Sequence, residues 1–222
     1  SVIDMLFHNP IVLAKRFATL DILSNGRTLA GLGIGWSEDE FLASNIPLVE
    51  RGRRADEFLE LLKSIWTDDI IDFKGRFYNV PSCKIGPKPK QRPIIPLFLG
   101  GSNPNTFSRM AKYANGWIGV VRNNLGQLKR TLDTLKIKVI EAKRNPDDFE
   151  LIVIVYPDLK KLTIDKGSRL AFTGAVEQVG SDIEKLKKIG IGHIILNFNR
   201  SQIEYDMNGI IEASKQILIY AK

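Results

Sequence analysis

The sequence has one cysteine, Cys83, and two histidines, His8 and His193, among its 222 residues. A single cysteine excludes an internal disulfide framework, and two distant histidines give no convincing ligand spacing for zinc, so no metal site is predicted. Cys83 lies in a segment rich in proline and lysine, with no histidine nearby in the sequence. A nucleophilic thiol needs a basic or cationic neighbour, so Cys83 is interpreted as a bystander.

Long apolar runs are also absent, and none of those present could cross a bilayer. The first residues, Ser1 to Asp4, contain no basic region leading into the core of a signal peptide. The sequence therefore predicts a soluble, cytoplasmic chain with no membrane partner.

Acidic residues are fewer than basic ones, 25 against 32, which gives a net charge of +7. The lysines are dispersed along helical segments, for example around Lys136 and Lys185, at the spacing of solvated faces. No basic stripe with interleaved aromatic residues is present, so a nucleic-acid partner is not predicted. The positive charge is better suited to attracting an anionic cofactor or substrate.

Strand-like and helix-like runs alternate along the chain, and hydrophobic residues make up 44% of it. The segments 151–155 and 193–198 are almost continuously apolar, as expected of parallel strands that are covered on both faces. The pattern predicts an α/β fold, a (β/α) barrel in one domain over residues 1–222. Strands are expected at 28–34, 97–99, 117–121, 150–156 and 193–198, helices at 10–23, 51–66, 106–113, 125–143, 176–189 and 203–220, and a small hairpin at 72–78.

A first glycine-rich loop follows the strand 28–34, where Gly31, Gly33 and Gly35 precede Trp36. Glycines at the end of a strand remove Cβ atoms and let a flat ligand approach the backbone, although they also allow tight packing of a strand against a helix. The segment from Ser37 is typical of a helix start, with Ser37 as the N-cap.

A second such loop, Gly100-Gly101-Ser102-Asn103, follows the strand 97–99. Glycines followed by serine and asparagine at a helix N-terminus offer N–H, hydroxyl and amide donors and the positive end of the helix dipole, which suit a phosphate. The alternative is an ordinary Asx-type N-cap after a glycine turn. In a parallel barrel, both loops lie at the carboxyl ends of strands, where ligands bind.

The chain resembles the luciferase-like monooxygenase superfamily, especially its branch of F420-dependent oxidoreductases related to methylenetetrahydromethanopterin reductase. The order and spacing of several short motifs carry this resemblance along nearly the whole chain. They are Asn9-Pro10, Gly26 through Trp36, Arg51 through Glu57, Gly75 through Tyr78, Pro87-Lys88-Pro89, Gly100-Gly101-Ser102, Asn115-Gly116-Trp117 and Phe172 through Val179.

The resemblance implies a (β/α)8 TIM barrel that binds FMN or the deazaflavin coenzyme F420 at its mouth. The reduced cofactor would pass hydride to a small organic substrate or, if it is FMN, react with oxygen. A non-catalytic partial barrel is the alternative. In relatives, a non-prolyl cis peptide often lies where this chain has Ser1-Val2. The implied phosphate contacts are Gly100, Gly101, Ser102 and Asn103, and the implied ring and ribityl contacts are Ser1, Val2, Gly33, Ile34, Gly35, Trp36 and Asp39.

Two departures from the family pattern are present. Asn115 stands where relatives usually have aspartate, which puts one local hydrogen bond in doubt. The chain also begins at the end of what would be the third strand, so the domain is expected to be N-terminally incomplete, with open sheet edges. A homodimer or larger homo-oligomer is therefore predicted, with the 51–66 helix as a candidate contact because it couples the apolar residues Phe58, Leu61 and Leu62 to a basic start.

Several single residues have two interpretations. His8 and Trp36 are the candidate catalytic residues. His8 either acts on a substrate proton or is a bystander, and Trp36 either lines the cofactor or packs in the core. Asp39 is a ligand contact or a first-turn acid that favours the helix dipole, and Glu57 is an ion-pair partner or, less favoured, an acid catalyst. His193 is interpreted as structural, Asn197 and Asn199 as possible ligand contacts, and Arg169 as a contact of the cofactor tail or of solvent.

Overall fold

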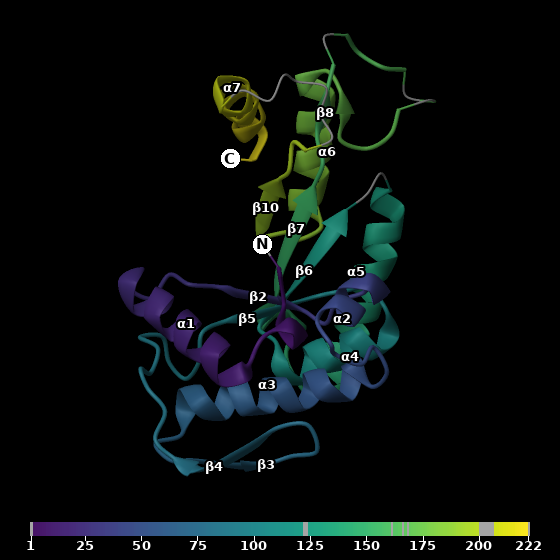
Figure 1. Cartoon of the computed structure of the whole chain (residues 1–222). Coiled ribbons are helices and arrows are strands. Elements are labelled where there is room, and N and C mark those ends of the chain that lie inside the picture. Colours follow the sequence, from purple (N-terminus) through teal and green to yellow (C-terminus); the bar gives the residue numbers. More distant parts are fainter. Residues whose placement is uncertain are drawn as a thin grey trace. The chain divides into compact units, whose positions relative to one another are not determined.

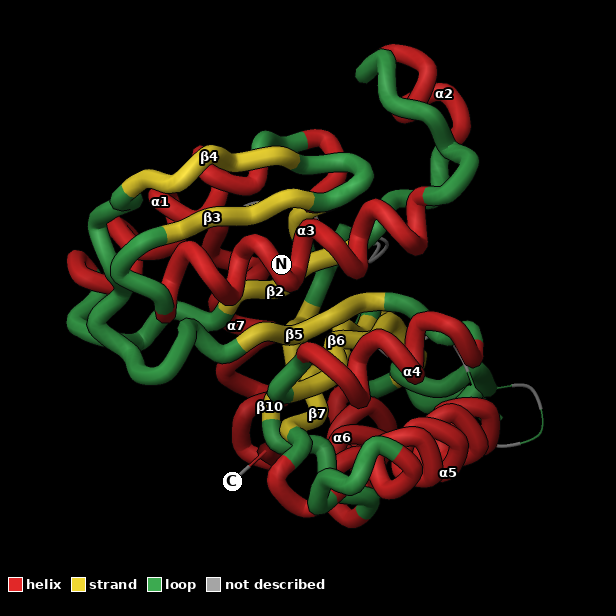
Figure 2. Tube along the Cα trace, turned by 90° about the horizontal axis from the view of Figure 1, so that it is seen from below, coloured by secondary structure: helices red, strands yellow, loops and turns green. Residues whose placement is uncertain are grey.

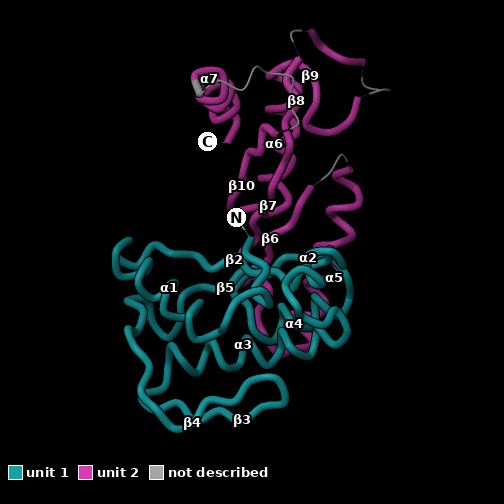
Figure 3. The backbone as a smooth tube through the Cα atoms, viewed as in Figure 1, with its two compact units in different colours: residues 1–116 teal, residues 117–222 magenta. Residues whose placement is uncertain are grey.

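The computed structural model describes residues 2–121, 124–160, 162–165, 167, 169–199 and 207–221. The chain divides into two compact units, Ser1–Gly116 and Trp117–Lys222, which Figure 3 shows in different colours. Each unit contains parallel strands and the helices that connect them (Figure 1), and each is described separately.

Three parallel strands form the sheet of the first unit. They lie in the order β1 (Ile3–Asp4), β2 (Ala30–Gly33) and β5 (Leu97–Gly100). Asp4 pairs with Gly33, and Leu32 pairs with Leu99. Because the strands are parallel, their carboxyl ends share one edge, as the sequence predicted. Two short elements follow β1 and β2, the 3-10 helix η1 (Met5–Phe7) and helix α2 (Glu38–Ala43).

Helices α1 (Pro10–Leu23) and α3 (Arg51–Thr67) pack against each other in the first unit. Helix α1 begins where expected because the side chain of Asn9 accepts hydrogen bonds from the N–H groups of Ile11 and Val12. Trp66, fully buried, meets the Phe17 ring edge-on and donates from Nε1 to the carbonyl of Ala14 at 3.1 Å. This contact fixes the C-terminal part of α3 on α1.

The apolar face of α3 is not available for self-association. Phe58, Leu61 and Leu62 are completely buried within the chain. The expectation that these three side chains form a contact between copies is therefore wrong, because their apolar surface is already covered by the core of the first unit.

An antiparallel hairpin, β3 (Ile71–Lys74) and β4 (Asn79–Cys83), runs alongside α3 (Figure 2). Its tip is fixed by Glu57, whose carboxylate accepts from the N–H groups of Arg76 (3.0 Å), Phe77 (2.9 Å) and Tyr78 (2.6 Å). Glu57 thus holds a backbone turn. The contacts of its carboxylate are with backbone N–H groups and are not the predicted ion pair with an arginine side chain. The hairpin itself was predicted.

In the second unit, β6 (Gly116–Val121), β7 (Glu150–Val155) and β10 (His193–Leu196) lie in that order, and β7 and β10 are parallel. Val153 and Val155 of β7 are fully buried, in keeping with the predicted covered strand. The helical elements are α5 (Leu125–Glu141), η2 (Pro146–Asp148), α6 (Val176–Lys188), α7 (Met207–Leu218) and η3 (Ile219–Ala221). The predicted start of the last helix, at 203, lies outside the described residues.

Two strands of two residues each, β8 (Asp158–Leu159) and β9 (Thr173–Gly174), were not predicted. The segment between them is tied to α6 through Asp182, which is 1% exposed. Arg169 donates to both carboxylate oxygens of Asp182, at 2.7 and 2.9 Å, and Lys185 and the N–H of Phe172 each donate at 2.9 Å. Arg169 is thus engaged in a largely buried ion pair, so contact with solvent does not describe it.

No helix in the described part of the chain combines the length and the apolar character needed to span a membrane.

Candidate functional site

The carboxyl ends of β2 and β5 bring two predicted residues, Gly33 and Gly100, to one edge, beside the carboxyl end of β1. A Cβ atom on Gly33 would lie 2.8 Å from Oδ1 of Asp4 and 3.1 Å from Cγ1 of Val2, so both side chains lie directly over this glycine. One step beyond the Leu32–Leu99 pair, the same parallel register leads to Gly33 and Gly100. Asp4, which the sequence did not single out, faces the same edge as Gly33.

Gly35 is required at the turn from β2 into α2. Its φ of +75° is one that residues with a Cβ rarely adopt, and a Cβ there would lie 2.7 Å from the Phe41 ring. The turn places Trp36 in solvent, 84% exposed, so its interpretation as a core residue is wrong. Asp39 lies in the first turn of α2, and Ser37 caps this helix by accepting from the N–H of Glu40 at 3.4 Å.

The second glycine loop leads directly into α4 (Pro104–Tyr113). Asn103 accepts from the N–H of Thr106 at 2.9 Å, so the Asx-type N-cap is present. The helix begins two residues earlier than predicted because Pro104, with no N–H to leave unpaired, is well suited to its first position. Gly101 has a φ of +118°, and a Cβ there would lie 2.8 Å from Cγ2 of Thr106. A larger residue at 101 would therefore be strained, because its backbone would stay in the left-handed region and Thr106 would have to shift.

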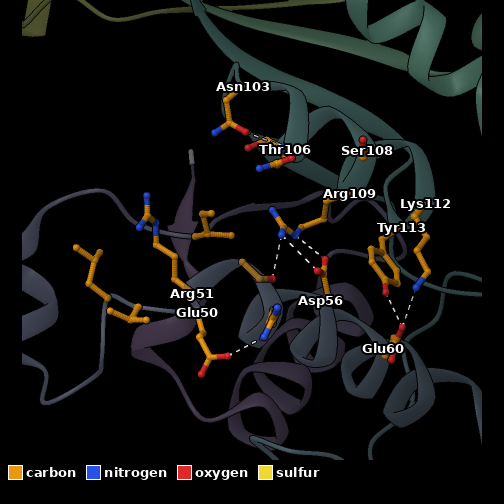
Figure 4. A pocket seen from close by; sticks show the side chains of 16 residues that line it. Glu50, Arg51, Asp56, Glu60, Asn103, Thr106, Ser108, Arg109, Lys112 and Tyr113 are labelled. Carbon is orange, nitrogen blue, oxygen red and sulfur yellow. Dashed lines mark hydrogen bonds and ion pairs between the residues drawn. The ribbon is translucent and has the colours of Figure 1, made fainter.

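A pocket of about 650 Å³ lies between α3 and α4 in the first unit (Figure 4). Among the predicted site residues, Ile34 and Asn103 line it, whereas His8, Trp36 and Gly101 do not. Most of its lining was not foreseen. The residues added by the structure include Glu50, Arg51, Gly52, Arg53, Asp56, Glu60, Asn105, Thr106, Ser108, Arg109, Lys112 and Tyr113.

The N-terminal turns of both helices open onto this pocket. Helix α3 starts after Glu50, which has a φ of 64° and makes no side-chain cap, and it has no acidic residue in its first turn. Each helix N-terminus carries a partial positive charge from its unpaired N–H groups. Arg51 adds a full charge, and its Nε is buried without a hydrogen-bond partner in the part of the chain that the structure describes. The pocket therefore favours an anionic group.

The other cations around the pocket are paired. Arg109, 8% exposed, donates from Nε to Asp56 at 2.6 Å and from a terminal nitrogen to the carbonyl of Gly52 at 2.9 Å. Arg53 pairs with Glu50 at 3.1 Å. Among the described contacts, these neutralising pairs leave Arg51 as the cation of the pocket with no ion pair.

A second charged cluster lies at the other end of α4. Glu60 accepts from Lys112 at 3.0 Å and from the Tyr113 hydroxyl at 2.5 Å. Burial and the hydrogen bond to Glu60 raise the pKa of Tyr113 to about 12. The hydrogen bonds from Tyr113 and Lys112 outweigh burial and hold the pKa of Glu60 below its ordinary value. At neutral pH the cluster therefore consists of an ion pair between Glu60 and Lys112 and a neutral Tyr113 phenol that donates to Glu60.

The remaining predicted residues are dispersed. His8 is half-buried directly before α1, and its N–H donates to the carbonyl of Met5 at 3.0 Å. Asn115, which departs from the family pattern, makes a local hydrogen bond in which its Oδ1 accepts from the N–H of Leu97 at 3.0 Å. In the second unit, Asn197 accepts from the N–H of Asn199 at 3.1 Å. Ser1 and its peptide bond lie outside the described residues.

The parallel α/β units and the glycine-rich strand ends agree with what the family comparison finds. A family model described as luciferase-like monooxygenase matches residues 1–159, and the chain belongs to this family. Its fold is similar to that of an F420-dependent secondary alcohol dehydrogenase solved with an F420–acetone adduct, with a TM-score of 0.79 and 20% identity. That likeness covers 97% of this chain and 76% of the other, and it confirms the predicted α/β fold class.

Two curated relatives match at higher identity. An uncharacterised protein of Mycobacterium tuberculosis (strain ATCC 25618 / H37Rv) is 38% identical over 117 residues, which is 52% of this chain and 41% of the relative. The FMNH(2)-dependent dimethylsulfone monooxygenase of Pseudomonas putida is 35% identical over 133 residues, 59% of this chain and 36% of the enzyme. The alignments thus span less than half the length of either relative.

Proposed function

We propose that the chain is part of a flavin- or deazaflavin-dependent oxidoreductase that binds FMN or F420 and transfers hydride to a small organic substrate. The observation that carries the proposal is the convergence of the N-termini of α3 and α4, with the unpaired Arg51, on one pocket. The similarity to proteins named for FMNH(2) and F420 supports it.

The residues present fit a phosphorylated cofactor. A phosphate in the pocket would accept from the Arg51 guanidinium and from N–H groups at the two helix N-termini. Asn103 uses its amide oxygen for the cap, which leaves its amide nitrogen as a donor. We assign Gly100, Gly101 and Ser102 to the loop beside the phosphate.

The rest of the cofactor would follow the glycine-rich strand ends. Val2, Gly33, Ile34 and Gly35 would border the ring, together with the exposed Trp36 and, less directly, Asp39 and Ser1. When bound, the reduced cofactor supplies the hydride. His8 is the residue of this chain that we assign to holding a proton for the substrate, on its imidazole.

Replacing Arg51 with glutamine is expected to weaken FMN binding by about 10- to 100-fold, because a charged hydrogen bond to phosphate is lost. Riboflavin has the same ring and no phosphate, so its affinity should stay unchanged. Quenching of flavin fluorescence measures both affinities, and F420 is titrated in parallel. Arg16→Gln, on the exposed side of α1, is the matched control. Failure of the wild-type chain to bind either cofactor at micromolar concentration would overturn the proposal.

A non-catalytic cofactor-binding role is the second candidate, favoured by the partial coverage of the relatives. It predicts binding of FMN or F420 without turnover. Oxidation of FMNH(2) that depends on dimethyl sulfone, or reduction of F420 that depends on a secondary alcohol, would exclude it.

We also propose that the chain self-associates, because β1 and β10 are edge strands of the sheet in the described part of the chain and another copy could cover them. Because Phe58, Leu61 and Leu62 are buried, the contact between copies would have to be made by other residues. Sedimentation velocity at micromolar concentration should show a dimer or larger species. A folded monomer that binds no hydrophobic dye would contradict this prediction.

A further inference from the structure

Arg109 links two helices at the point where the anion pocket opens. It extends from the middle of α4 to the first turns of α3, where it bonds to the Asp56 carboxylate and to the Gly52 carbonyl (Figure 4). Gly52 directly follows Arg51, so this carbonyl belongs to the turn that presents the unpaired guanidinium. A guanidinium is planar, with donors in a fixed fork, and it can therefore hold a carboxylate and a carbonyl in one defined geometry.

The same turn of α3 is held from the opposite side by the β3–β4 hairpin. Arg76 pairs with Glu50 at 2.7 Å, and Arg54 stacks over the Phe77 ring at 4.6 Å. The turn is thus fixed between the hairpin and α4. The α4 side of this arrangement depends on Arg109, because its two bonds reach the turn directly.

Close packing around Gly52 shows how tightly the geometry is set. A Cβ atom on Gly52 would lie 3.0 Å from a terminal nitrogen of Arg109, closer than nearly all ordinary Cβ contacts. The φ of Gly52 is not in the positive range, so alanine suits its backbone. Glycine at 52 is therefore explained by the space that the guanidinium needs.

We propose that Arg109 is a positioning residue for phosphate binding: through Gly52 and Asp56 it orients the first turn of α3 so that Arg51 faces the pocket. This inference rests on the proposed function, since it concerns the same anion site. The guanidinium of Arg109 is paired with Asp56, so it acts on the phosphate through the turn and not by direct contact. Its loss should therefore affect affinity for the phosphate group and not affinity for the flavin ring.

The test compares FMN with riboflavin in Arg109→Lys and Arg109→Gln variants, with Arg130→Lys on α5 as the matched control. Lysine keeps the charge but cannot supply the fork, so both variants should lower FMN affinity by about tenfold or more while riboflavin affinity stays constant. Circular dichroism and the thermal midpoint show whether each variant is folded. A purely structural role would lower both affinities together.

Gly52→Ala provides a second variant that is expected to stay folded, because alanine favours a helix more than glycine does. As a single substitution, Gly52→Ala should reduce the ratio of FMN affinity to riboflavin affinity. In the Arg109→Gln background it should reduce this ratio little further, since both changes act through one contact. Full FMN affinity in both Arg109 variants, with affinity lost in Arg51→Gln, would overturn this inference and leave the proposed function intact. Loss of FMN binding by the wild-type chain would instead overturn the proposed function.

Discussion

Replacing Asp182 with alanine is expected to lower the free energy of unfolding of its unit by about 3–5 kcal/mol, the cost of breaking a buried charge pair. Asp182 is 1% exposed, and it accepts from Arg169, Lys185 and the N–H of Phe172. Alanine would leave the mostly buried Arg169 guanidinium and this N–H without their acceptor. Urea unfolding followed by circular dichroism measures the change.

The pH dependence provides an independent check of the same contacts. Burial alone would raise the pKa of Asp182, but the hydrogen bonds from Arg169, Lys185 and Phe172 outweigh it and hold the pKa below its ordinary 3.8. Stability from this group is therefore fully present above the pKa of the unfolded chain and is lost as the pH falls through the folded pKa. Asp182→Asn should be less stable than wild type at pH 7 and should lose less stability on acidification below about pH 4.

Glu184→Ala is the matched control, because Glu184 is an exposed acid on α6, the helix that carries Asp182. It should change stability by less than about 0.5 kcal/mol. Equal stability of wild type and Asp182→Ala at pH 7 would contradict the account of the buried pair.

Trp66→Ala is expected to destabilise the first unit by about 3–5 kcal/mol, because it removes the largest fully buried side chain from between α3 and α1. The loss includes the edge-on contact with Phe17 and the hydrogen bond to Ala14. The substitution would leave a cavity, and the carbonyl of Ala14 would lose its Nε1 donor. Denaturant unfolding monitored by far-ultraviolet circular dichroism avoids dependence on the tryptophan signal.

Trp66→Phe separates the two contributions. It retains much of the aromatic volume and removes the N–H donor, so its cost should be nearer to about 1–2 kcal/mol. Trp36→Ala is the control, since Trp36 is 84% exposed and should contribute little to stability. If Trp66→Ala were no less stable than Trp36→Ala, the assignment of Trp66 to the core would be wrong.

Local signals in the sequence predicted much of the fold. Helix α1 has the predicted bounds because Asn9, Pro10 and the Asn25-Gly26 pair mark its two ends. Strands β8 and β9 were missed because two residues are too few for any periodic pattern. They pair with each other, and directly before β9 the N–H of Phe172 donates to Asp182 of α6, a contact distant in sequence.

The candidate site was predicted only in part. Glycine spacing indicates where strands end, and Gly33 and Gly100 do lie at a shared edge. The anion pocket could not be predicted in the same way, because it joins the first turns of two helices. Arg109 and Asp56 are 53 positions apart, and nothing local to either residue specifies their contact. Arg51 lies in one of the motifs that carry the family resemblance, but nothing in the sequence indicates that its Nε would lack a hydrogen-bond partner.

The clamp of Glu57 on the hairpin tip has a consequence for how the sequence can vary. A Cβ atom on Gly75 would overlap the carboxylate of Glu57, which occupies that space to reach three N–H groups. Any larger residue at 75 would force the carboxylate out and leave the turn without its acceptor. The effects of changing Gly75 and Glu57 are therefore expected to be coupled: a larger residue at 75 should cost much less once Glu57 no longer occupies that space.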